Sequence, residues 1–226
     1  MATAAIIGAF DADTAQAASY AITYTPAANL LPVLFVDITA TAIATPGVTC
    51  TVGGVTFHFV GRQARGSHSH YLWVGEQLTT NVAHTVTVSV AGDNGTGGNI
   101  GVIGVSGMTR KGVQAVKQSK SATGAAATVP QTVFDANALT ANLILSGIAY
   151  DAALGPETVP SSFTKISSSS YATPSTTLEV MKLESGFTTT TITYGTAPAV
   201  GVWSVWSLEL DVSAAPLGRS SVGLVA

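Results

Sequence analysis

Charged side chains are scarce in this chain of 226 residues. Nine Lys and Arg and twelve Asp and Glu make up 9% of the sequence, whereas an average soluble domain has roughly 25%. The net charge is −3, so the chain lacks the basic surface that holds a phosphate backbone. We expect no nucleic acid partner.

Cysteine is nearly absent, since Cys50 is the only one. A lone thiol excludes an internal disulfide and every zinc site that needs two or more thiolates. No pattern in the sequence indicates a cofactor. We expect the stability of the protein to come from packing and assembly.

Export signals and membrane spans are also lacking. No Lys or Arg precedes the short apolar run at the N-terminus, and Asp11 and Asp13 come directly after that run, which is unlike a secretory signal peptide. Residues 38–61 are uncharged, but their alternation and their turn residues favour strands over a membrane span. We expect no transmembrane segment and no membrane insertion. A protein without a signal peptide can still reach the outside of a cell by host lysis or by a secretion system that reads another signal.

Thr and Ser take the place of the missing charges and contribute 52 residues. Short segments alternate apolar and polar residues along the whole chain, most clearly at 82–90, where Val residues share one strand face. No apolar helical period persists for three turns. The pattern predicts an all-β fold of about eleven or twelve antiparallel strands, arranged as a two-sheet β-sandwich of the jelly-roll kind. Immunoglobulin-type and barrel topologies are the alternatives.

The strands are expected to form one domain over residues 19–212. Within it, residues 48–90 predict a meander, residues 92–99 a hairpin loop rather than a calcium site, and residues 139–150 a central strand buried on both faces. Two extended arms flank this domain, and we expect both to pack on neighbouring subunits or on another protein of the same assembly. The arms are residues 1–18 and 213–226.

Histidine provides the only candidate metal ligands. His68 and His70 lie on one side of an extended segment. No carboxylate accompanies this pair, so a polar loop over residues 61–69 is the favoured interpretation, and no metal is expected. His84 is in register with the valines of its strand, which predicts a core histidine held by a hydrogen bond.

The same loop holds Arg62 and Arg65, two of the four arginines in the chain. This concentration of positive charge favours contact with an anion or a partner, together with His68 and His70. Solvation of an ordinary loop explains it equally well.

Aromatic residues give a second candidate contact. Tyr71 and Trp73 alternate on one strand face, where they predict either core packing or an exposed platform for a sugar ring. Trp203 and Trp206 are expected on opposite faces of the last strand.

Catalytic patterns find no support. Ser106 lies in a segment that lacks the closing glycine of a nucleophile elbow, so it is interpreted as a strand end. No pair of carboxylates is placed for acid and base catalysis. We predict no catalytic residue and no enzymatic activity. The acids interpreted as surface or turn residues are Asp135, Asp151, Glu157, Glu179 and Glu184.

Strand motifs recur in a fixed order: the runs 30–36, 52–60, 85–90, 104–107 and 139–149, the strand with Trp73, and a closing Trp-Ser-Leu-Glu-Leu at 206–210. This order resembles a jelly-roll module of tailed-phage virion proteins. The resemblance covers about four fifths of the chain, and its motifs are structural. It implies a head decoration or cement protein, a head spike or a fibre.

These observations lead to one functional expectation and two alternatives. We expect a non-enzymatic virion structural protein on the exterior of the capsid, forming homo-oligomers and binding the major capsid protein or other virion proteins. The first alternative is an adhesin or spike that binds carbohydrate or a host receptor. The second is a bacterial surface or secreted protein.

Overall fold

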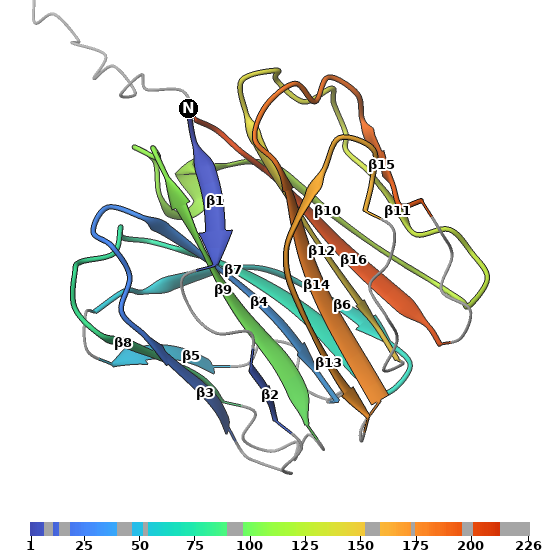
Figure 1. Cartoon of the computed structure of the whole chain (residues 1–226), viewed down its shortest axis with the longest axis horizontal. Coiled ribbons are helices and arrows are strands. Elements are labelled where there is room, and N and C mark those ends of the chain that lie inside the picture. The colour runs from blue at the N-terminus through green and yellow to red at the C-terminus, as the bar shows by residue number, and fades with distance from the viewer. Residues whose placement is uncertain are drawn as a thin grey trace, which may run out of the picture.

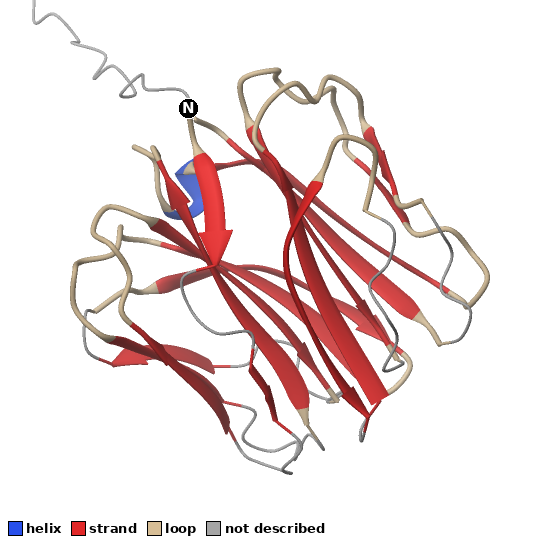
Figure 2. Ribbon diagram, in the orientation of Figure 1, coloured by secondary structure: helices blue, strands red, loops and turns tan. Residues whose placement is uncertain are grey.

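The computed structural model describes most of the chain. The described residues are 1–6, 11–13, 19–39, 47–51, 54–89, 97–151, 159–172, 175–195 and 201–212. They form strands and connecting turns, with one 3-10 turn (Figure 2), which confirms the all-β prediction. The predicted C-terminal arm and Glu157 lie outside this part of the chain.

We divide the strands into an N-terminal half (residues 1–106) and a C-terminal half (residues 116–212), joined by a connector (residues 107–115). The N-terminal half holds β1 (Thr3–Ile6), β2 (Asp11–Asp13), β3 (Ser19–Tyr24), β4 (Leu31–Ile38), β5 (Gly47–Thr51), β6 (Phe57–Arg65), β7 (His68–Gly75), β8 (His84–Ser89) and β9 (Gly98–Ser106). The connector holds η1 (Gly112–Gln114). The C-terminal half holds β10 (Val116–Gly124), β11 (Gln131–Val133), β12 (Leu143–Tyr150), β13 (Thr164–Ala172), β14 (Ser175–Leu183), β15 (Thr191–Thr193) and β16 (Trp203–Leu210).

Each half contributes one large antiparallel sheet and one small sheet. The large sheet of the N-terminal half has the order β1-β9-β4-β7-β6, and β2 continues the pairing of β1 along β9. Its small sheet has the order β3-β8-β5. The C-terminal half has the large sheet β10-β16-β12-β14-β13 and the small sheet β11-β15.

The four sheets stack in layers with three hydrophobic cores between them. The central core lies between the two large sheets and includes Phe35 and Leu145. A second core lies between the large and small sheets of the N-terminal half and includes Trp73. The third lies inside the C-terminal half and includes Ile192. The two small sheets therefore lie on opposite outer sides of the molecule (Figure 1).

This layering explains the burial of the central strands. Every residue of β4, β7, β12 and β16 is buried, because each large sheet has a hydrophobic core on both faces. The prediction of a central strand buried on both faces is confirmed at β12. An antiparallel sheet in a two-layer protein exposes one face to water and alternates accordingly.

The two halves repeat the same strand order. The equivalent strands are β1 and β10, β3 and β11, β4 and β12, β6 and β13, β7 and β14, β8 and β15, and β9 and β16. In both halves the β-bulge falls at the same place in the hairpin, between Phe59 and Gly61 and between Lys165 and Ser167. The chain is therefore an internal structural duplication.

The contacts between the large sheets follow this duplication. β6 packs against β10 and β16, and the equivalent strand β13 packs against β1, β2 and β9. β7 packs against β16, while β14 packs against β9. Such reciprocal contacts describe a pseudo-two-fold axis between the halves, as in a symmetric dimer fused into one chain.

The strand order confirms the two-sheet sandwich and corrects two expectations about topology. Each large sheet of the sandwich comes from one half of the chain, and the chain passes back and forth between the large and the small sheet inside each half. Residues 48–90 are not a meander, because β5 and β8 pair in the small sheet while β6 and β7 pair in the large one. β8 and β9 lie in different sheets and do not pair as a hairpin, and residues 92–96 of the predicted hairpin loop lie outside the described part of the chain.

The predicted N-terminal arm is partly bound within its own chain. β1 and β2 lie in this arm and pair with β9, and the side chains of Ala2 and Ala4 are buried in the central core. These segments close one edge of the large sheet.

Candidate functional site

A cluster of buried charges lies where the two halves meet. Arg65 ends β6, and its Nη2 donates to Oδ2 of Asp37 on β4 at 2.6 Å, with both side chains fully buried. Its Nη1 donates to Asp151, just past β12, and its Nε donates to Ser204 Oγ on β16 at 3.1 Å. One guanidinium thus joins the large sheets of both halves.

Two histidines of β7 complete this cluster, which we call the buried charge cluster (Asp37, Arg65, His68, His70 and Asp151), although the side chain of Asp151 at its rim is 21% exposed. His68 lies with Nδ1 3.7 Å from Asp37 Oδ2 and with Nε2 3.5 Å from Asp151 Oδ1. His70 Nδ1 lies 3.4 Å from the hydroxyl oxygen of Ser204. Because strand residues two apart point to the same face, both rings enter the interface between the sheets.

Burial and charge shift the pKa values inside the cluster. Burial lowers the pKa of His70 to about 4; Asp37 opposes this shift and Arg65 adds to it. The ring is therefore neutral at pH 7. Burial would raise the pKa of Asp37, but Arg65, followed by His68, outweighs it and holds the pKa of that carboxyl well below its usual range. Asp37 is therefore a buried anion that depends on Arg65.

Hydroxyl and amide groups of both halves surround the buried charges. Thr176 donates to Asp37 Oδ2, and Asn99 contacts the Thr176 hydroxyl at 3.5 Å. Ser169 donates to Asn99 Oδ1 at 2.6 Å. Among the described residues, Asp37 Oδ1 and His70 Nε2 have no hydrogen-bond partner. The network is therefore charge-rich and incompletely bonded.

The same place in the duplicated half is filled differently. Asp37 pairs with His70 and Asn99 in the N-terminal sheet. The equivalent residue, Ala149, pairs with Leu178 and Ser204. The C-terminal half therefore accommodates Ala and Leu where the N-terminal half holds Asp and His.

The predicted polar loop is wrong, because residues 61–69 form the end of β6, a tight turn and the start of β7. Arg65 is 2% and His68 4% exposed, so neither side chain is presented to an external partner. Arg62 is half-buried, and its Nε donates to Ser69 Oγ at 2.9 Å. Within the described part of the chain, no three His, Cys, Asp or Glu side chains are grouped to hold a metal ion.

Of the two interpretations of Tyr71 and Trp73, core packing is confirmed and the exposed platform is excluded. Tyr71 and Trp73 point into the core between the N-terminal sheets and are 0% and 2% exposed, so neither offers a ring face to a sugar. Trp203 and Trp206 do lie on opposite faces of β16, in different cores. His84 is buried as predicted, with Nε2 3.3 Å from the Thr80 carbonyl oxygen.

Two glutamates that lie inside the sheets correct the picture of surface acids. Glu179 is buried and accepts a hydrogen bond from Tyr150. Glu209, which sequence reasoning missed as a site residue, accepts from Asn142 Nδ2 at 2.6 Å and from the Leu139 amide at 2.9 Å. Both hold strands together. An acid inside an apolar strand was the available signal.

The remaining candidates lie at strand ends. Ser106 ends β9 and bonds to the Thr3 hydroxyl at 2.6 Å, as expected for a strand end. Asp135 is exposed and pairs with Lys120 at 2.9 Å. Glu184 pairs with Lys182 at 2.5 Å.

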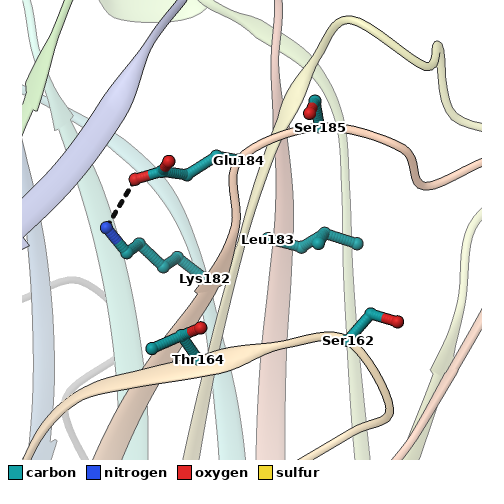
Figure 3. A pocket seen from close by; sticks show the side chains of 6 residues that line it. All are labelled: Ser162, Thr164, Lys182, Leu183, Glu184 and Ser185. Atoms are coloured by element: carbon teal, nitrogen blue, oxygen red, sulfur yellow. Dashed lines mark hydrogen bonds and ion pairs between the residues drawn. The ribbon is translucent and has the colours of Figure 1, made fainter.

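The Lys182 and Glu184 pair lies in a polar surface cleft of about 370 Å³ (Figure 3). Ser162, Thr164 and Ser185 line the same cleft. Because the two charges neutralise each other, this cleft offers hydroxyl groups and little net charge to a ligand.

Comparison with known proteins assigns no family: no family model, curated protein or solved structure matches the chain. In the described residues, no helix is long and apolar enough to cross a membrane.

Proposed function

We propose that this chain is a non-enzymatic structural protein of a phage particle, which binds the exterior of the capsid as part of a homo-oligomer. The observation that supports the proposal most directly is the pair of uncharged outer faces on the two small sheets. The N-terminal outer face is Ser19, Ala21, Thr23, Thr85, Thr87 and Ser89. The C-terminal outer face is Gln131, Val133, Thr191 and Thr193.

Both outer faces suit contact with other subunits. Their outward side chains are short or uncharged, so covering them removes no charge from water and has a low desolvation cost. Cross-strand bonds hold the hydroxyl groups in place, as between Thr23 and Thr85 at 2.8 Å. A rigid surface loses little conformational entropy on binding.

The position of the two faces also favours a bridging role. They lie on opposite outer sides of the layered stack (Figure 1). One chain can therefore contact two neighbours at once, and such bivalent contact raises the strength of attachment well beyond that of one face. Contact with two neighbours at once suits a protein that cements a capsid.

The first experiment asks whether the protein is part of a particle. Particles released by lysis of a culture that carries the gene are separated by density gradient, and peptides of this chain are quantified against the major capsid protein. We expect a fixed ratio across the particle peak. Absence from the peak, while capsid protein is present, would contradict the proposal.

A second experiment tests the outer faces. The double variant Thr87→Lys/Thr191→Lys places a charge on each face, and we expect it to fold normally but to be depleted from particles. The control Thr109→Lys adds a charge at an exposed position of the connector and should be retained. Equal retention of both variants would show that the outer faces are not the attachment surfaces.

Selective binding of the purified protein on a glycan array would instead favour the adhesin alternative.

A further inference from the structure

The central core is an interface between two related but unequal surfaces. Phe35 pairs with Leu72 and Gly101, and Gly147 pairs with Val180 and Trp206 in the equivalent register. Phe35 and Gly147 are therefore equivalent residues. They also touch each other, because a Cβ on Gly147 would lie 2.6 Å from the Phe35 ring. Only residues on a two-fold axis meet their own equivalents.

The pair on the axis excludes association of like halves. Two N-terminal halves joined in this way would bring one Phe35 ring onto another, and two C-terminal halves would leave a void between glycines. A packed core tolerates neither a ring without space nor an empty volume of that size.

A second contact selects the same pairing. Trp206 lies over Gly61, where a Cβ would come within 2.4 Å of the indole Cη2 atom. The equivalents of these residues are Gly101 and Ser167. Two N-terminal halves would therefore bring Gly61 opposite Gly101 and leave the space of the indole empty. Two C-terminal halves would bring Trp206 opposite Ser167, whose side chain occupies the space that Gly61 leaves free.

The buried charge cluster also favours the pairing of an N-terminal half with a C-terminal half. Asp151 follows Tyr150, and the equivalent residue, which follows Ile38, is Thr39. In a pair of two N-terminal halves, Arg65 would face the neutral hydroxyl of Thr39 in place of the Asp151 carboxylate. The buried guanidinium would then lack one of its two anionic partners.

We propose that the inner face of each half accepts only the inner face of the opposite half, and that a second copy of the chain binds there by exchange of whole halves. An exchanged dimer reproduces the contacts between the two large sheets, because each N-terminal half still meets a C-terminal half. Domain swapping of this kind joins copies at low cost in free energy. This inference rests on the packing of the halves and is independent of the proposed function.

The connector decides between monomer and dimer. β9 and β10 are separated by three strand spacings and one sheet spacing, since β10 packs against β6 at the far edge. With strands roughly 4.8 Å apart and sheets about 10 Å apart, the connector must span about 17 Å. Deleting residues 109–114 leaves three residues, which reach at most about 14 Å. The shortened chain cannot close on itself.

The test is the molar mass of this deletion variant, measured by light scattering after size-exclusion chromatography. We expect a closed dimer, twice the mass of the chain, with an unfolding midpoint close to that of the full chain. The matched control replaces residues 109–114 by six Gly and Ser residues and should stay a monomer of about 22.8 kDa. A folded monomer, or an open series of larger species, would overturn the proposal.

Two further measurements use chains with the full connector. Gly147→Phe and Phe35→Gly should each lower the unfolding midpoint, and the double variant should recover part of the loss because the ring and the space exchange places. A double variant less stable than both single variants would contradict directional pairing. If the deletion variant does not fold, the wild-type chain refolded from denaturant at increasing concentration should yield a growing fraction of dimer, and monomer alone at every concentration would reject exchange.

Discussion

At the scale of single residues, the buried charge cluster is the feature that the fold does not require. The duplicated position holds Ala149 and Leu178 in place of Asp37 and His70, so the same sheet packs without charge. Buried ion pairs often give less stability than apolar residues of similar volume, but removing one partner is costly. Such a cluster is therefore poorly explained by stability alone. It can instead make the pairing of unlike halves selective.

Arg65 should therefore be among the most sensitive positions in the chain. Arg65→Met removes the guanidinium and leaves Asp37 buried without its cation, which we expect to lower the free energy of unfolding by about 3–5 kcal/mol. Denaturant titration followed by circular dichroism measures the loss. The control Arg62→Met, at a half-buried arginine that bonds to Ser69, should cost about 1 kcal/mol or less. Equal losses of unfolding free energy for the two variants would mean that the buried charge cluster does not depend on Arg65.

His70 should make the protein acid-sensitive. Its pKa falls from the ordinary value of 6.5 to about 4 on folding, so the unfolded chain takes up the proton first and stability is lost as the pH falls from 6.5 towards 4. The loss is on the order of 3 kcal/mol. Asp37, with its lowered pKa, adds a further loss only below its ordinary value of 3.8.

Unfolding midpoints in denaturant at pH 7.5, 5.5 and 4.5 test this dependence. His70→Leu copies Leu178 of the other half and should flatten the profile over this range. An unchanged slope in His70→Leu would remove His70 as its cause.

Sequence reasoning at this scale succeeded where local pattern decides burial. The period-two alternation around His84, and that around Trp203 and Trp206, was sufficient to assign faces. It left Tyr71 undecided between core and surface and was wrong at Arg65, because the exposure of both depends on which sheet covers them, and a covering sheet leaves no mark on the sequence of one strand. Asp37 was overlooked although an acid in the apolar run 31–38 was visible.

At the scale of elements, alternation and turn residues found most of the large-sheet strands but not their partners. Pairings such as β5 with β8 or β10 with β16 join segments far apart in sequence, and register depends on packing against other layers. The duplication was equally hidden. Many equivalent positions of the core share apolar character but not identity, as in Val33 and Leu145 or Val36 and Ile148.

The contact between β6 and β16 gives a prediction for an element. Gly61→Ala places a Cβ where only 2.4 Å separates it from the Trp206 indole, and we expect a loss of about 1–3 kcal/mol from overpacking. The equivalent residue of β13, Ser167, already has a Cβ. Ser167→Ala should therefore change stability by about 0.5 kcal/mol at most. In a Trp206→Leu background the cost of Gly61→Ala should shrink, and an undiminished cost would place the strain elsewhere. Thermal unfolding measures all four chains.

At the scale of the whole molecule, the two halves depend on one shared core. The inner faces of both large sheets carry fully buried apolar side chains, including Phe35, Leu72, Leu145 and Leu208. Separating the halves would expose these side chains to water at roughly 25 cal/mol for each Å². Neither half keeps its large sheet covered on both sides without the other, so the repeats are expected to fold together.

The chain should accordingly unfold in one transition. Trp73 lies in the core of the N-terminal half and Trp203 in that of the C-terminal half, so Trp73→Phe weights the fluorescence signal towards the C-terminal half and Trp203→Phe retains the N-terminal reporter. In each variant, we expect the fluorescence midpoint in denaturant to coincide with that from far-ultraviolet circular dichroism, as two-state unfolding requires. Trp206 remains in both variants and reports the interface. If fluorescence preceded circular dichroism in one variant and followed it in the other, the halves would unfold independently. The interface between them would then be an accessory contact and not the core of the molecule.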